Sequence, residues 1–186
     1  MAEIHGHVAL TFDDGPHPGS TPPLLATLRA VGVRATFFIW GAHAARHPEL
    51  LRAVRAGGHV IANHTQTHPH LTRIGEPAAC DEIDRAQRTI RRITGRTPTL
   101  FRPPFGETNA RIRGHAARLG LAEVLWTVDT RDWAGASTDQ IVAAAATVRP
   151  GGIILMHDNG YRTTVAAVPR ILNGLAARGL APGTLG

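Results

Sequence analysis

The sequence predicts an α/β fold with a parallel sheet, arranged as a distorted or incomplete (β/α) barrel. Short apolar segments rich in Val, Ile, Phe and Leu alternate with longer segments of helical periodicity. Several short segments are apolar along their whole length, as strands covered on both faces are. The chain has 186 residues, fewer than the roughly 250 that a complete eight-fold barrel typically needs. An open doubly wound sheet is the second alternative.

The predicted strands are short and bounded by turn residues. The first, for example, is broken sharply by Gly15 and Pro16. The strands are predicted over His7–Phe12, Arg34–Trp40, His59–Asn63, Thr99–Pro103, Glu123–Asp129 and Gly152–His157.

The predicted helices carry start and stop signals. The Pro22-Pro23 pair suits a helix start, Ser137 is expected to cap the fifth helix, and Gly95 to end the third. Pro169 is expected to kink the last helix or delay its start. The helices are predicted over Leu24–Val31, Glu49–Ala56, Pro77–Thr94, Asn109–Leu119, Thr138–Val148 and Thr164–Arg178.

The length and composition favour a single soluble domain spanning residues 1–186. No apolar run approaches the roughly 18 residues of a membrane span. The N-terminal residues Met-Ala-Glu-Ile-His lack the basic and apolar regions of a signal peptide. Cys80 is the single cysteine, which excludes a zinc site built on a thiolate pair.

The formal net charge is +6, and every one of the 20 basic residues is Arg. Such a charge could attract nucleic acid or an anionic cell-wall polymer. The arginines spread evenly along the chain, however, which favours solvated helix faces. There is also no recognition motif or aromatic–basic platform. We therefore expect neither a nucleic-acid partner nor a membrane partner.

Polar side chains follow the ends of most predicted strands. In parallel α/β folds the strand C-termini open on one face, where the chemistry collects. We therefore expect these side chains to converge in one mouth, although they are far apart in sequence. They are Asp13 and Asp14 after the first strand, His64 after the third, Arg102 at the fourth, Asp129 and Asp132 after the fifth, and His157 and Asp158 after the sixth.

Two carboxylates end the first strand at Asp13 and Asp14. One could bind a metal ion while the other moves protons. The alternative is an ordinary acidic turn, since Asp favours turns.

His64 and His68 lie four residues apart, and in a helical turn this spacing would place both imidazoles within reach of one ion. His43 and His47 have the same spacing and also follow a strand, so spacing alone does not choose between the pairs. We favour a surface position for His43 and His47. His70 is expected near the mouth without a ligand role.

Three further side chains have both a chemical and a structural interpretation. Arg102 could fix an inward carboxylate or form a surface ion pair. Trp133, next to Asp132, could wall a substrate site or belong to the core. His157 ends a buried strand and could transfer protons or serve only structure.

Taken together and in this order, the segments TFDDGP, HTQTH, RPPFG, DTRDW and LMH resemble the five motifs of the polysaccharide deacetylase family. The family is also called the NodB-homology domain or carbohydrate esterase family four. The resemblance extends from Thr11 to about Leu180. It implies a distorted (β/α) barrel and the hydrolysis of acetyl groups with one divalent metal ion, usually zinc, although cobalt or another divalent ion can serve.

The resemblance also implies a role for each matching residue. The backbone N–H of Phe105 would face the oxyanion, and this role survives the exchange of the Tyr that many members have there. The other implied roles are Asp14, His64 and His68 as metal ligands, Asp13 as catalytic base, Arg102 as its orienting partner, Trp133 and Leu155 as walls of the acetyl pocket, and His157 as general acid tuned by Asp132.

The first expectation for activity is N-deacetylation of N-acetylglucosamine units in chitin, chitooligosaccharide or peptidoglycan. The alternative is O-deacetylation of acetylxylan, and a distant one is a non-catalytic carbohydrate-binding relative. The runs LFRPPFGETNA and ILMHD are similar to compact secreted members active on xylan or chitooligosaccharides. The expected partner is an acetylated oligo- or polysaccharide, and this substrate class implies an extracellular location. We also expect a monomer.

Overall fold

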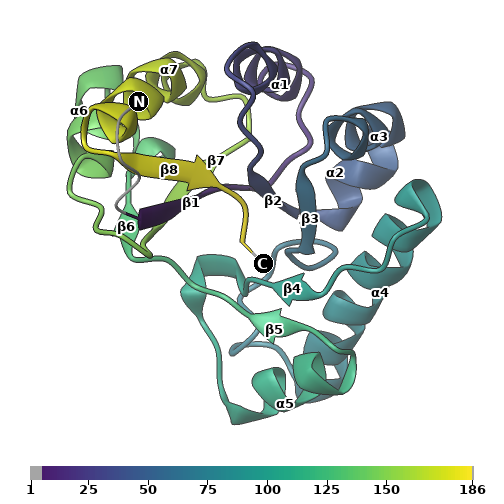
Figure 1. Cartoon of the computed structure of the whole chain (residues 1–186). Coiled ribbons are helices and arrows are strands. Elements are labelled where there is room, and N and C mark those ends of the chain that lie inside the picture. Colours follow the sequence, from purple (N-terminus) through teal and green to yellow (C-terminus); the bar gives the residue numbers. More distant parts are fainter. Residues whose placement is uncertain (1–5, 186) are drawn as a thin grey trace.

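The protein is a parallel sheet curved into an incomplete barrel, with helices on its outer side (Figure 1). The computed structural model describes residues 6–185. The N-terminal stretch considered above for a leader, residues 1–5, and residue 186 lie outside this range. The strand order is β5-β4-β3-β2-β1-β7-β6, and β8 pairs with β1 beside this path. All of these pairings are parallel, as predicted.

The strands place the predicted site residues at their C-terminal ends. β1 ends at Asp13, β3 at Asn63 directly before His64, and β7 at His157. Asp13 and His157 are register partners across β1 and β7. The strands are β1 (Gly6–Asp13), β2 (Thr36–Ile39), β3 (Val60–Asn63), β4 (Leu100–Phe101), β5 (Ala122–Glu123), β6 (Val128–Asp129), β7 (Ile153–His157) and β8 (Leu180–Gly183).

The helices follow their sequence signals closely. Ser137 and Gln140 form a capping box at the start of α6, and Gly95 ends α4 in the left-handed conformation, at φ 69°. The helices are α1 (Thr21–Ala30), α2 (Gly41–Arg46), α3 (Pro48–Ala56), α4 (Glu76–Thr94), α5 (Ala110–Arg118), α6 (Thr138–Ala145) and α7 (Arg162–Ala177), with short 3₁₀ turns at Pro104–Gly106 and Asp132–Ala134.

The single strand predicted over Glu123–Asp129 is wrong. It is two strands, β5 paired with β4 and β6 paired with β7, at opposite ends of the sheet. The reason lies in the residues between them. The carbonyls of Val124 and Leu125 accept hydrogen bonds from the buried guanidinium of Arg102, at 3.2 and 2.9 Å, instead of joining a ladder. Among residues 6–185 no pairing joins β5 to β6, so the barrel stays open there.

The structure contains two elements that were not predicted, and the expectation for the last helix needs correction. The helix α2 and the strand β8 were not predicted, because α2 is short and β8 contains Pro182 and Gly183, which have low β-propensity. The last helix begins at Arg162, before the predicted start, and Pro169 lies inside it. Pro169 therefore does not delay the helix.

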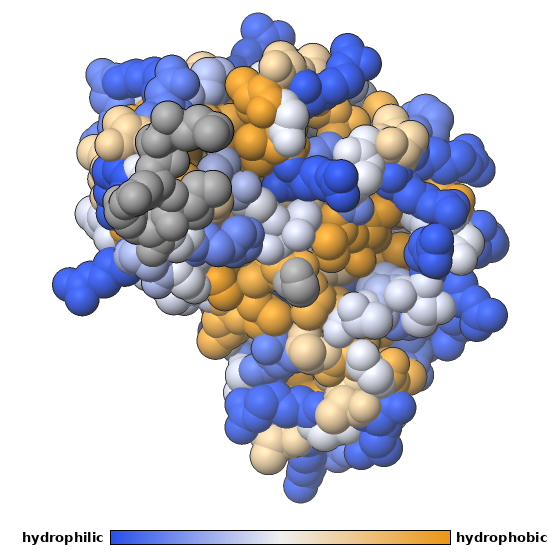
Figure 2. All heavy atoms as spheres, in the orientation of Figure 1, coloured by the Kyte–Doolittle hydropathy of each residue, from blue (hydrophilic) through white to orange (hydrophobic). Residues whose placement is uncertain are grey.

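The core consists of the inner strands and the apolar faces of the helices around them. Val8, Leu10, Phe12, Phe37 and Ile154 are fully buried in one large cluster. A smaller cluster lies between α4 and α5 and includes Phe101. In Figure 2, hydrophilic side chains cover most of the rim, and a hydrophobic area lies in the middle of this face, where Figure 1 places β4.

Within residues 6–185, none of the helices combines the length and the apolar character needed to cross a bilayer.

Candidate metal centre and active site

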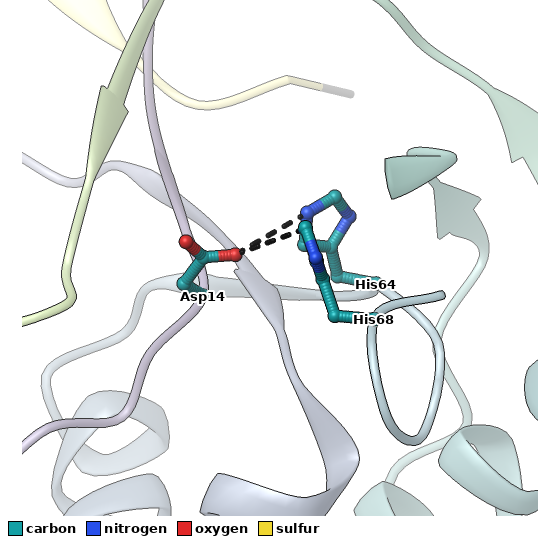
Figure 3. A group of neighbouring side chains, drawn as sticks. All are labelled: Asp14, His64 and His68. Carbon is teal, nitrogen blue, oxygen red and sulfur yellow. Dashed lines mark ion pairs between the residues drawn. The ribbon is translucent and has the colours of Figure 1, made fainter. Parts of the chain in front are cut away.

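Asp14, His64 and His68 point toward one another from two loops (Figure 3). One ligand atom from each lies within 4.8 Å of the others. Asp14 Oδ1 is 3.6 Å from His64 Nε2 and 3.4 Å from His68 Nε2. The three residues therefore form one Asp-His-His cluster that could hold a metal ion, as the sequence predicted.

The spacing of the two histidines would bring their rings together in a helical turn, but the structure has no helix there. The segment from His64 to His68 is a loop in which Thr65 and His68 adopt left-handed backbone angles, φ 66° and 60°. Thr65 Oγ1 accepts a hydrogen bond from the backbone N–H of His68 at 3.1 Å. This tight loop, rather than helical periodicity, brings the two rings together.

The loop is fixed to α4. Glu82 accepts hydrogen bonds from the backbone N–H of Thr67 at 2.6 Å and from its hydroxyl at 2.9 Å. Asn63 accepts one from the N–H of Thr65 at 2.9 Å and donates to the carbonyl of Ile83 at 3.0 Å. These contacts hold the loop before any ion binds.

The donor set suits a divalent ion. Nδ1 of His64 lies 2.7 Å from the carbonyl of Arg102, so Nδ1 carries the proton and the lone pair of Nε2 faces the cluster. Burial lowers the pKa of His64 and of His68 to about 3, which keeps both rings neutral. Asp14 Oδ1 is buried and has no hydrogen-bond partner in residues 6–185. A cation would satisfy this oxygen.

Asp13 lies beside the cluster and is paired with Arg102. Arg102 Nη1 donates to Asp13 Oδ1 at 2.7 Å, and the two side chains are 0% and 3% exposed. Burial raises the pKa of Asp13, and the charge of Arg102 opposes this rise. Arg102 also lies 4.0 Å over the ring of Phe38. Arg102 therefore holds an inward carboxylate, and the alternative of a surface ion pair does not apply.

His157 is the second titratable group near Asp13. Its Nδ1 lies 2.7 Å from Asp132 Oδ1, and its backbone N–H donates to Asp132 Oδ2 at 2.8 Å. Burial disfavours the imidazolium, but the hydrogen bond and the charge of Asp132 outweigh it and raise the pKa of His157 to about 9. The ring therefore carries a proton at neutral pH in the metal-free protein.

A cavity of about 360 Å³ opens over these groups. Trp133 is 50% exposed and Leu155 only 3% exposed, and both line it. Phe105 lines it too, with a left-handed backbone at φ 59°. All ten residues predicted for the site therefore gather around one cavity. Eight of them line it, and the other two are bonded to lining residues: Asp132 to His157 and Arg102 to Asp13.

Two neighbours of the site were not predicted. His43, expected at the surface, is half-buried, and its Nδ1 lies 2.9 Å from the carbonyl of Asp14. Its ring stacks on Trp40, which in turn lies 5.2 Å from the ring of His68. Trp126 lines the cavity from between β5 and β6. The sequence shows that His43 lies four residues before His47. The atom that His43 contacts, however, is a backbone carbonyl, and a backbone carbonyl leaves no signal in the sequence.

His70 lies near the mouth, as expected, and takes no part in the ligand cluster. Its ring stacks on that of Phe105 with centroids 3.9 Å apart, and its Nδ1 lies 3.1 Å from Glu107.

Comparison with known proteins gives a consistent result. The family model described as polysaccharide deacetylase matches residues 3–124. A family 4 carbohydrate esterase from Streptomyces lividans, solved in complex with acetate, has a TM-score of 0.94 and 49% identity over 98% of this chain and 94% of that one.

Two curated relatives differ in their named substrates. A chitooligosaccharide deacetylase of Bradyrhizobium sp. (strain ANU 289) is 46% identical over 83% of this chain and 71% of its own length. A bifunctional xylanase/xylan deacetylase of Cellvibrio japonicus is 40% identical over 97% of this chain, which spans 27% of that protein.

The family model and these similarities agree with the curled parallel sheet and the Asp-His-His cluster at its strand ends. The fold is the distorted (β/α) barrel of the NodB type. This chain belongs to the polysaccharide deacetylase family, carbohydrate esterase family four, and is an enzyme that hydrolyses acetyl groups on carbohydrate.

Proposed function

We propose that this protein is a zinc-dependent N-deacetylase acting on N-acetylglucosamine units of chitin, chitooligosaccharide or peptidoglycan. The observation that carries the proposal is the arrangement of Asp13 beside Asp14, His64 and His68 in one cavity. The 46% identity to a chitooligosaccharide deacetylase over most of the chain supports the amide substrate.

Asp14, His64 and His68 are the proposed ligands. Two neutral imidazoles and one carboxylate suit zinc, and three protein ligands leave positions open for water and substrate. A divalent ion there supplies positive charge against a developing oxyanion and makes nearby water more acidic. With Asp13 and Asp14 ionised, a dication brings the formal charge of these three groups to zero.

The remaining chemistry belongs to side chains and backbone of this chain. Asp13 accepts the proton of the attacking water, and its raised pKa makes it a stronger base than an ordinary carboxylate. Arg102 keeps Asp13 oriented. The backbone N–H of Phe105 donates to the oxyanion, a contact often worth about 3–4 kcal/mol.

His157 completes the reaction as general acid. Asp132 keeps its imidazolium charged, and the proton passes to the departing nitrogen. An amine leaves poorly without that proton. Trp133 and Leu155 form the apolar walls against which the acetyl methyl packs.

O-Deacetylation of acetylxylan is the second candidate, because the matched region of the xylanase/xylan deacetylase covers nearly all of this chain. The same groups would serve an ester, with an alkoxide departing in place of an amine. The acetate bound to the Streptomyces lividans esterase is the product of either reaction.

The test measures acetate release from acetylated chitooligosaccharides and from acetylxylan side by side, with zinc or cobalt added. Release from the chitooligosaccharides at the higher kcat/KM is expected. No release from the amide substrate, with release from acetylxylan, would replace the first candidate by the second. No release from either would revive a purely carbohydrate-binding role.

We further propose that residues 1–186 form one catalytic domain that works as a monomer outside the cell. The substrate class supports the location, since such polymers are extracellular. Light scattering and fractionation of the source cells test these two points.

A further inference from the structure

Asp158 is a buried carboxylate that the proposed reaction does not use. It follows His157 at the end of β7, and its side chain is fully buried. Its two oxygens each accept a hydrogen bond of 2.6 Å, one from the hydroxyl of Ser20 and one from that of Thr21. Both donors are neutral. A buried carboxylate held only by hydroxyls costs stability, so its presence calls for a reason.

Ser20 and Thr21 lie at the start of α1, at the end of the segment that begins with Asp14. Ser20 Oγ also accepts the backbone N–H of Gly160 at 2.9 Å. At the other end of the segment, the backbone N–H of Asp158 donates to the carbonyl of Asp13 at 2.8 Å. Residues 158–160 are thus bonded to Asp13, directly before segment 14–21, and to Ser20 and Thr21 at its end.

The middle of the segment is held as well. A Cβ atom on Gly15 would lie 2.5 Å from Asp158 Oδ2, so the carboxylate packs directly on the backbone that follows Asp14. Asn159, the next residue, donates from Nδ2 to Asp14 Oδ2 at 3.5 Å. Asp14 itself has a left-handed φ of 74°, a conformation that persists only where the surroundings fix it.

We propose that Asp158 is a positioning residue that clamps segment 14–21 to the end of β7 and thereby aims the carboxylate of Asp14 at His64 and His68. The inference rests on the proposed role of Asp14 as a metal ligand. The clamp also fixes Asp14 relative to His157, because His157 is the last residue of β7 and directly precedes Asp158. Asp158 contacts neither substrate nor ion in this role.

The test is zinc affinity of the metal-free protein, measured by competition with a chromophoric chelator. Asp158→Ala is expected to weaken zinc binding about tenfold or more, as changes to residues that orient ligands do. Asp84→Ala is the matched control. It removes a carboxylate that bonds His115, 2.8 Å away, between α4 and α5, and should leave the dissociation constant unchanged.

Thr21→Val keeps the shape of the side chain and removes one hydroxyl donor, so it tests the clamp even if Asp158→Ala does not fold. It is expected to weaken zinc binding severalfold. A merely structural role would lower the melting temperature of the metal-free variants without moving the dissociation constant. Dissociation constants within twofold of the parent value in the folded variants would overturn the proposal.

Acetate release is measured separately on the zinc-loaded parent protein. A parent that binds zinc but releases no acetate contradicts the proposed function and leaves the clamp to be judged on affinity alone.

Discussion

The ring of His157 and the carboxylate of Asp132 lie 2.7 Å apart between β7 and the turn after β6, and this pair sets the protonation state of the histidine. Asp132 is fully buried and also accepts a hydrogen bond from the hydroxyl of Thr164 at 2.7 Å. The imidazolium is therefore held by an anion that cannot turn toward water. The pH dependence of the enzyme should reflect this pair.

Asp132→Asn is expected to move the alkaline limb of the kcat–pH profile toward lower pH by about 1–3 units, because the imidazolium loses its anionic partner. The measurement is kcat against pH at saturating substrate and zinc. Asp139→Asn, which removes an exposed carboxylate bonded to Arg170, is the control and should leave the profile in place. An unchanged limb in Asp132→Asn would show that His157 is not the group titrating there.

The same pair predicts the pH dependence of stability in the metal-free protein. The folded-state pKa of His157 is raised from 6.5 to about 9, so its contribution to the unfolding free energy is complete below pH 6.5 and is lost as the pH rises through 9. Denaturant titrations at several pH values should show this decline in the parent and a shallower one in Asp132→Asn. If the unfolding free energy declined equally steeply with pH in both proteins, the pair with Asp132 would not be what raises the pKa of His157.

Asp13→Asn should retain zinc and lose turnover. The amide keeps the shape of the side chain but cannot accept the proton of water, so kcat should fall by about 10²–10⁴-fold. Metal content by atomic emission and kcat on acetylated chitooligosaccharide are measured on the same preparation. Substantial residual turnover would remove Asp13 as the base, whereas lost zinc would indicate that it is a ligand.

His64→Ala should weaken zinc binding by more than the roughly 10–100-fold typical of residues that only orient ligands. His47→Ala is the control. Within residues 6–185, the side chain of His47 forms one ion pair, with Glu49 at 3.8 Å, and this pair lies outside the ligand cluster. His43→Ala is a less neutral control than the sequence indicates, because His43 contacts the carbonyl of Asp14. Equal zinc content in the His64 and His47 variants would exclude the proposed site.

Zinc should raise the melting temperature of the parent protein. Binding to the folded state alone adds about 2.7 kcal/mol at a free concentration 100 times the dissociation constant, which corresponds to roughly 5–10 °C for a chain of this size. Thermal scans with zinc and with chelator measure the shift, and His64→Ala should show almost none. A shift of equal size in that variant would place the stabilising ion elsewhere.

Local pattern determined much of this protein. The alternation of apolar strands and helices, the cap at Ser137 and the stop at Gly95 depend on neighbouring residues, so the sequence alone predicts them. The parallel order then places Asp13 and His157 at one edge, because carboxyl ends of parallel strands open on the same face.

Tertiary structure decided what depends on distant partners. Arg102 donates hydrogen bonds to the carbonyls of Val124 and Leu125, and the strand predicted there is therefore divided into β5 and β6. The left-handed turn at Thr65, rather than a helix, brings His64 and His68 together. His43 contacts the backbone carbonyl of Asp14. Asp158 accepts hydrogen bonds from the hydroxyls of Ser20 and Thr21, more than a hundred residues away in the chain. Such bonds form only after folding, so no local pattern encodes them.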